Sequence, residues 1–95
     1  MVFDISKITG IGPYKAKTDS GRDIYFKGEH AFLVVNPNTI EVRCDTRLSS
    51  NLEEKFESVM ESRYFGKGGI EIVLAGQLTQ EEIEDLIRLS YNLTQ

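Results

Sequence analysis

Four strand-like segments follow one another in the first half of the chain with almost no sequence between them. They cover residues 14–18, 23–27, 31–35 and 39–44. The links between the last three are Lys27-Gly28-Glu29 and Asn36-Pro37-Asn38, and Asp19-Ser20-Gly21 precedes them. Gly, Pro, Asn and Asp are the residues that tight turns favour. Parallel neighbours need a crossover of about a dozen or more residues, so links this short predict an antiparallel meander.

The segment 39–44 shows which side of this sheet should be buried. Its apolar and polar residues alternate, a period of two that is typical of a half-buried strand. Ile40, Val42 and Cys44 share the predicted inner face, whereas Glu41, Arg43 and Asp45 share the face expected to meet water. Cys44 is the single cysteine of the chain. We therefore expect it to be a buried structural thiol.

Two amphipathic helices are predicted in the second half. Ser50-x-x-Glu53 has the pattern of a capping box and predicts a helix over residues 50–60, with Leu52, Phe56, Val59 and Met60 as its apolar stripe. Thr79-x-x-Glu82 repeats that pattern and predicts a final helix that ends near Leu93. The acidic first turn of the final helix also suits the helix dipole.

A fifth strand is expected over residues 69–74, between the two helices. Glu71 should point away from the side that Ile70 and Ile72 share. The predicted order is then a short helical turn, four strands, a helix, a strand and a helix. This order indicates an α+β fold, an antiparallel meander sheet of about five strands with both helices packed on one face. A chain of 95 residues is expected to form one such domain over residues 1–95.

Charge and hydropathy narrow the class of protein. Residues 1–50 hold seven Lys/Arg and six Asp/Glu, for +1, and residues 51–95 hold four and nine, for −5. The total of −4 is not that of a typical nucleic-acid-binding domain, which is basic. No stretch approaches the ~20 apolar residues that a membrane span needs. The N-terminus has no signal-peptide pattern, so we expect a cytoplasmic protein without a membrane partner.

Four blocks of the sequence form a recognisable set that spans about residues 24–93. They are residues 25–32 (YFKGEHAF), 40–45 (IEVRCD), 64–74 and Leu89-Ser90-Tyr91. This set resembles the MmcQ/YjbR family of small bacterial α+β domains. The family usually has a Trp at the start of the fifth strand, where this chain has Gly69 or Ile70. The first half contains Gly12-Pro13, Ile24-Tyr25, Gly28 and Phe32, and with these residues it is also similar to the N-terminal domain of the TfoX competence regulators. The resemblance implies a secretion-chaperone-like fold and a role in DNA binding, the latter by fold analogy alone.

No catalytic or metal-binding set is evident in the sequence. His30 is the only histidine, and no nucleophile or acid accompanies it, so we expect a surface histidine. The Gly66–Gly69 run leads into a predicted strand, whereas a P-loop leads into a helix. The carboxylates of the last helix are expected to form a solvated face. The sequence therefore predicts neither an enzyme nor a cofactor.

The remaining candidates for function are basic and aromatic residues on the predicted meander and in the 63–69 loop. They are Lys15, Lys17, Lys27, Arg43, Arg63, Tyr64 and Lys67. A basic patch of this kind attracts a phosphate backbone, although Glu41, Asp45 and Glu71 would dilute its charge. Three hypotheses follow. The first is a small non-catalytic binding or regulatory domain with a protein partner; the second is DNA binding through the basic sheet face and the 63–69 loop; the third is a small-ligand protein or an enzyme.

Overall fold

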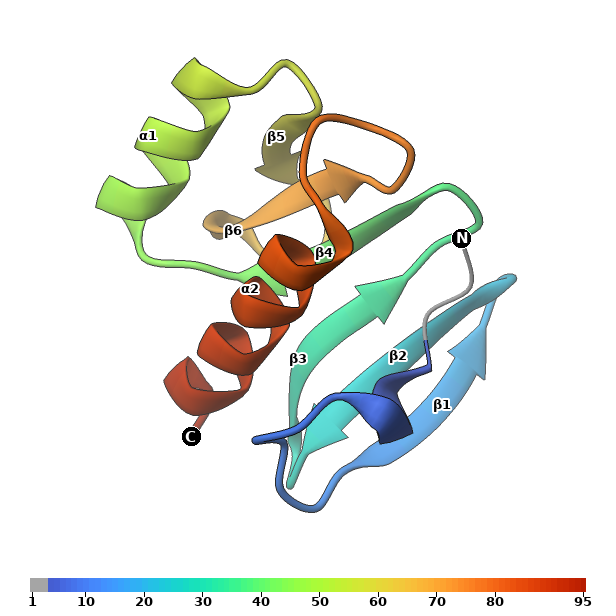
Figure 1. Ribbon diagram of the computed structural model, residues 1–95. Helices are drawn as coiled ribbons and strands as arrows, with labels where there is room; N and C mark the ends of the chain where they lie inside the picture. The colour runs from blue at the N-terminus through green and yellow to red at the C-terminus, as the bar shows by residue number, and fades with distance from the viewer. Residues whose placement is uncertain (1–3) are drawn as a thin grey trace.

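One antiparallel sheet with two helices on one face makes up residues 4–95, which the computed structural model describes (Figure 1). The elements are η1 (Ile5–Lys7), β1 (Lys15–Asp19), β2 (Arg22–Lys27), β3 (His30–Val35), β4 (Thr39–Arg43), α1 (Thr46–Lys55), β5 (Val59–Ser62), β6 (Gly66–Val73) and α2 (Gln80–Leu93). Within these residues the sheet has six strands in the order β1-β2-β3-β4-β6-β5. The predicted α+β fold is confirmed, with one strand more than expected.

The first helix does not begin where the sequence pattern placed it. The predicted capping box of Ser50 and Glu53 is wrong, because Ser50 lies inside α1. Asp45 is the N-cap instead, and its carboxylate accepts hydrogen bonds from the backbone N–H groups of Arg47 (2.9 Å) and Leu48 (3.1 Å). An Asp at this position satisfies amides that have no partner within the helix.

The same helix also ends early, and the unpredicted strand β5 follows it. Lys55 is the last residue of α1, whereas residues 56–60 had been assigned to the helix. Val59 pairs with Ile72 of β6 and is buried, whereas Met60 is exposed. Pairing with a neighbouring strand has here overridden the helical spacing of these apolar residues.

The main core lies between the sheet and the helices. Ile40 and Val42 of β4, Ile70 and Ile72 of β6, and Ile83 and Ile87 of α2 have no exposed surface, and Phe56 packs at the margin of this core. The predicted packing of the helices against the sheet face that carries Ile40 and Val42 is therefore confirmed. Cys44 is a free, buried thiol, as expected, and burial together with nearby carboxylates raises its pKa to about 11. In the described residues, neither helix has the length and apolar character of a membrane span.

Ser90 fixes α2 onto the centre of the sheet. Its hydroxyl donates to the carbonyl oxygen of Phe32 (2.6 Å) and accepts from the backbone N–H of Arg43 (2.8 Å). Phe32 is the extra residue of a bulge between β2 and β3, and its ring meets the ring of Tyr91 edge-on at 4.9 Å. Both helices lie on this face, and within residues 4–95 the other face of the sheet has no helix (Figure 1).

The predicted capping box of the last helix is present. The N–H of Glu82 donates to the hydroxyl of Thr79 (3.1 Å), and the N–H of Thr79 donates to the Glu82 carboxylate (2.9 Å). We expect Thr79→Ala to lower the free energy of unfolding by about 1 kcal/mol, because it removes the N-cap acceptor. Urea denaturation measures this change. Thr79→Ser keeps the hydroxyl and should stay close to the parent, so an equal loss in both variants would contradict the capping role.

Candidate functional site

The open face of the sheet is the face that points away from α1 and α2. One row of directly paired residues crosses it, namely Lys17, Ile24, Val34, Glu41, Glu71 and Met60. Paired residues share a face, and so do alternate residues along a strand. Lys15, Arg22 and Arg43 therefore lie on the open face with Lys17. Four cationic residues from β1, β2 and β4 are thus brought to one side of the molecule.

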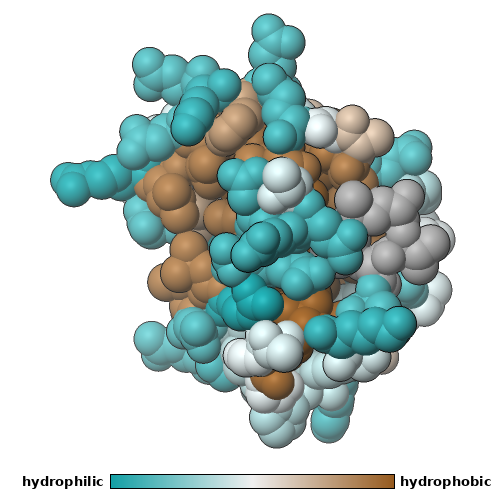
Figure 2. All heavy atoms as spheres, viewed as in Figure 1, coloured by the Kyte–Doolittle hydropathy of each residue, from teal (hydrophilic) through white to brown (hydrophobic). Residues whose placement is uncertain are grey.

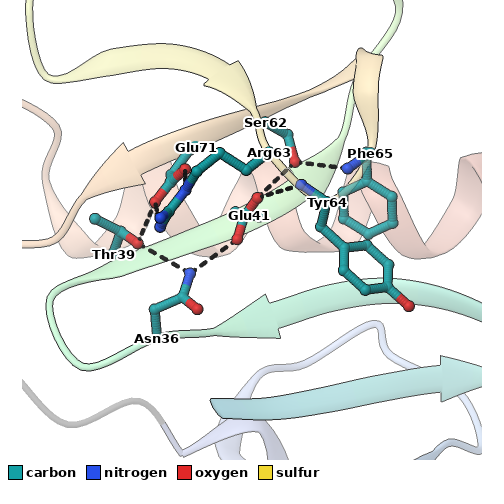
Figure 3. A network of polar contacts seen from close by, with 8 residues as sticks. All are labelled: Asn36, Thr39, Glu41, Ser62, Arg63, Tyr64, Phe65 and Glu71. Atoms are coloured by element: carbon teal, nitrogen blue, oxygen red, sulfur yellow. Dashed lines mark hydrogen bonds and ion pairs between the residues drawn. The ribbon is translucent and has the colours of Figure 1, made fainter. Parts of the chain in front are cut away.

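A second, smaller apolar cluster covers the middle of the open face. Ile24, Ala31 and Val34 are buried there, with Phe26 and Phe65 packed against them. Phe65 belongs to the turn between β5 and β6, which folds over the open face in Figure 3. This cover explains why apolar residues of β2 and β3 are buried on a face without helices.

Gly69 is the residue that lets this turn approach the sheet. It stands across from Arg43 in the register of β4 and β6. A Cβ atom at position 69 would lie 2.7 Å from the Cβ of Phe65 and 2.6 Å from the carbonyl oxygen of Val42. Both distances are too short for any side chain. The glycine run 66–69 was expected to belong to a loop before a strand over residues 69–74. It lies within β6 instead, and the turn itself is residues 63–65.

The prediction that Glu41 and Glu71 face water is wrong. They point to the open face as expected, but segment 62–65 covers them, and they are only 1% and 2% exposed. Figure 3 shows how the cover binds Glu41. One carboxylate oxygen accepts from the Ser62 hydroxyl (2.8 Å) and the Tyr64 N–H (2.8 Å), and the other accepts from the Asn36 amide (2.9 Å).

Glu71 lies directly across from Glu41 and holds Arg63. The Nε and Nη2 atoms of Arg63 each donate to a different oxygen of Glu71, at 2.9 and 2.7 Å, and the Thr39 hydroxyl donates to the same carboxylate (2.7 Å). The Arg63 side chain is 75% exposed. Its hydrogen bonds to Glu71 and the charge of Glu71 raise the pKa of Arg63. The guanidinium is therefore held in one direction at the surface by a buried carboxylate.

The surroundings of Glu41 do not suit it to acid–base catalysis. Burial alone raises the pKa of Glu41, but the hydrogen bonds from Asn36, the Tyr64 N–H and Ser62, with the charge of Arg63, outweigh it and leave the pKa below its ordinary value. A general acid or base works best with a pKa near the working pH, so Glu41 is a poor one. Residues 4–95 contain no group of three or more His, Cys, Asp or Glu side chains that could hold a metal ion.

A hollow of about 600 Å³, which we call the arginine recess, lies beside this network. Its lining residues are Ser20, Arg22, Asn36, Pro37, Arg63 and Tyr64. The Arg22 guanidinium lies 5.4 Å from the centre of the Tyr64 ring. The Nε atom of Arg22 is buried, and within the described residues it has no hydrogen-bond partner. The recess therefore combines two guanidinium groups, one of which contains a buried donor without an acceptor.

Five of the seven predicted site residues lie on the open face or at its recess. Lys15 and Lys17 are exposed on the edge strand β1. Arg43 is half-buried, with its guanidinium 4.9 Å from the centre of the Phe65 ring and its Nε donating to the carbonyl oxygen of Ala31 (2.7 Å). The other two of the five, Arg63 and Tyr64, line the recess.

The other two predicted residues lie elsewhere. Lys27 lies on the helix side. Its Nζ donates to the carbonyl oxygen of Tyr91 (3.1 Å) and lies 4.6 Å from the centre of the Tyr91 ring. Lys67 is exposed in a small hollow beside α1 that Glu53 and Glu61 also line. Arg22 was missed. The alternation in β2 does not show which side faces the main core, because both sides carry apolar or aromatic residues.

The helix side of the molecule has a different character. Hydrophobic residues gather over α1 and between the two helices (Figure 2). Leu48, Leu52, Phe56, Leu78 and Leu86 line a groove there of about 270 Å³, with Lys55, Glu82 and Asp85 at its rim. His30 is exposed, as expected for a surface histidine. Among the described residues, this groove has one cationic side chain, Lys55, beside two carboxylates.

Comparison with protein-family models, with curated proteins and with solved structures finds no match for this chain. The predicted relationship to the MmcQ/YjbR family, and the similarity of the first half to the TfoX domain, therefore stay predictions. The open face and its recess are the features of the molecule that bear most directly on function.

Proposed function

We propose that this chain is a small binding domain without catalytic activity of its own, and that its open face binds an acidic segment of a protein partner. The observation that carries the proposal is the gathering of cationic residues on one face. They are Lys15, Lys17, Arg22, Arg43 and Arg63. Of the carboxylates on that face, Glu41 and Glu71 are buried and hydrogen-bonded, and Asp19 stands at the end of β1.

The arginines on this face are already held in place before a partner arrives. Arg43 lies over Phe65 and donates to a backbone carbonyl, Arg22 lies over Tyr64, and Arg63 is bound by Glu71. Side chains that are ordered in advance lose less conformational freedom on binding. Arg and Tyr are also the residues that contribute most often to the energetic centre of protein interfaces. Both facts favour a recognition surface.

The edge of the sheet favours a protein partner over other anions. β1 is the first strand in the sheet order, so its outer edge pairs with no other strand of the described residues, and all five of its residues are exposed. An extended peptide can add to such an edge through backbone hydrogen bonds. Acidic residues of that peptide would then lie across from Lys15 and Lys17, where opposite charges attract. The free thiol of Cys44 fits a reducing compartment such as the cytoplasm.

Duplex DNA is the second candidate partner. The observation that favours it is the same cationic face, together with the exposed Tyr64. Against it stands the net charge of −4, since a chain of that charge repels a phosphate backbone except at a local patch. DNA binding would show itself by a steep fall of affinity with added salt.

Charge reversal on β1 tests the proposal. We expect Lys15→Glu/Lys17→Glu to weaken binding of an extended Asp/Glu-rich peptide about tenfold or more, which is roughly 1.4 kcal/mol. Fluorescence anisotropy of the labelled peptide measures the affinity. Lys7→Glu/Lys55→Glu makes the same charge change away from the open face and should bind as the parent does. Equal losses in both variants, or tight duplex DNA binding without peptide binding, would overturn the proposal.

A further inference from the structure

We propose that the arginine recess binds a phosphate monoester group, either on a phosphorylated side chain of the partner or as free phosphate. This inference rests on the proposed binding role of the open face and names the chemistry of one part of it. The recess begins where β1 ends, because Ser20 follows β1 directly and lines the recess. A phosphorylated residue in a segment that pairs with β1 would therefore have an arginine-lined hollow beside it.

The recess has guanidinium donors that no acceptor among the described residues uses. A guanidinium carries five N–H donors. In the described residues the Arg22 side chain makes no hydrogen bond or ion pair, and its Nε is buried. Arg63 uses its Nε and Nη2 on Glu71, which leaves the Nη1 group free. A buried donor without an acceptor costs stability, and an oxyanion bound in the recess would supply that acceptor.

The other polar groups that line the recess already donate hydrogen bonds to acceptors of this chain. The Asn36 amide donates to Thr39 and to Glu41, and the Ser20 hydroxyl donates to the Asp19 carboxylate (3.3 Å). Among residues 4–95, no carboxylate lines the recess. Selectivity would therefore come from the two guanidinium groups.

Two guanidinium groups on different elements suit a phosphate better than a carboxylate. The Glu71 carboxylate shows that a single arginine already bonds both oxygens of a carboxylate. A phosphate monoester presents three acceptor oxygens and nearly two negative charges, so it can bond Arg22 and Arg63 together. The ionised Glu41 and the Glu71 carboxylate offset part of the arginine charge. We therefore expect free phosphate to bind weakly, with a Kd of roughly 1 mM, and a phosphopeptide that also pairs with β1 to bind more tightly.

Nuclear magnetic resonance of the whole chain tests this site without a variant. The probes are inorganic phosphate, an acidic peptide with one phosphoserine, and the same peptide without the phosphate. We expect phosphate at roughly tenfold its Kd to move the Nε–H signals of Arg22 and Arg63. Absence of movement at the Arg22 signal with both phosphate and phosphopeptide would overturn the inference.

A matched pair of variants separates this inference from the proposed function. Arg22→Gln should abolish the effect of phosphate and the advantage of the phosphopeptide, whereas Arg47→Gln on α1 should change neither. If Arg22→Gln keeps the phosphopeptide advantage while Lys15→Glu/Lys17→Glu loses peptide binding, the recess proposal is wrong and the binding role stands. If phosphate moves the Arg22 signal but neither peptide binds, the recess is supported and the protein-binding role is wrong.

Discussion

Replacing Glu41 by alanine is expected to lower the free energy of unfolding by about 3 kcal/mol, a large effect for a charged residue. The change leaves the Ser62 hydroxyl and the Tyr64 N–H without the acceptor that each now has, and the Asn36 amide keeps only its bond to the Thr39 hydroxyl. Every buried donor left unpaired costs about 1–3 kcal/mol, and water entering from the nearby surface will restore part of the loss. Urea denaturation at neutral pH measures the effect.

Glu61→Ala is the matched control, because Glu61 belongs to the same sheet, in the edge strand β5, but is exposed. It removes the same charge and should change stability by less than about 0.5 kcal/mol. The pKa of Glu41 is lowered in the folded chain, so its contribution is present above the unfolded pKa of about 4.3 and is lost as pH falls through the folded pKa. The electrostatic part of the Glu41→Ala defect should therefore shrink below about pH 4. A defect no larger than that of Glu61→Ala would contradict the buried network.

Gly69→Ala is expected to destabilise the fold by roughly 3 kcal/mol, because the new methyl group would overlap atoms that cannot easily move. One of them is the Val42 carbonyl oxygen at 2.6 Å, and the other is the Cβ of Phe65 at 2.7 Å. To relieve the overlap, β6 must move away from β4 at Val42, and the 63–65 turn must lift off the open face at Phe65. Such a movement would also expose the apolar cluster under Phe65 and displace Tyr64 and Arg63 from the recess.

The adjacent glycine gives a close control for this variant. At Gly68 the nearest atom to a new Cβ would be the Phe65 carbonyl oxygen at 3.7 Å, which is an ordinary contact. Gly68→Ala should therefore leave stability within about 0.5 kcal/mol of the parent. Thermal and urea denaturation of both variants compare them directly. Similar stabilities for the two variants would show that the turn does not pack closely on Gly69.

Much of the fold was predictable from local sequence. The short links between strands required an antiparallel meander, and the Thr79-Glu82 capping box located the final helix. Strand β5 was missed because Val59 and Met60 continue the helical spacing of Leu52 and Phe56, and only the partner strand β6 makes Val59 a strand residue. A local pattern does not contain the identity of a distant pairing partner.

The candidate site was less predictable, for a related reason. Alternation along β4 correctly assigned Glu41 to the face away from the helices, but it does not tell what covers that face. The cover comes from residues 62–65, which are far away in the sequence, and depends on Gly69. Arg22 and Lys27 lie on opposite faces of β2, and the mixed apolar and aromatic pattern of that strand did not separate them.

The most direct test of the proposed binding face is to map, by backbone amide signals and arginine Nε–H signals, where the phosphoserine-containing acidic peptide contacts the chain. We predict that the signals that move belong to β1, around Lys15 and Lys17, and to the Arg22 and Arg63 side chains, while those of α1 and α2 stay in place. Movement confined to the groove between the helices, around Leu52 and Leu86, would contradict the open face as the binding surface, and so would the absence of any movement.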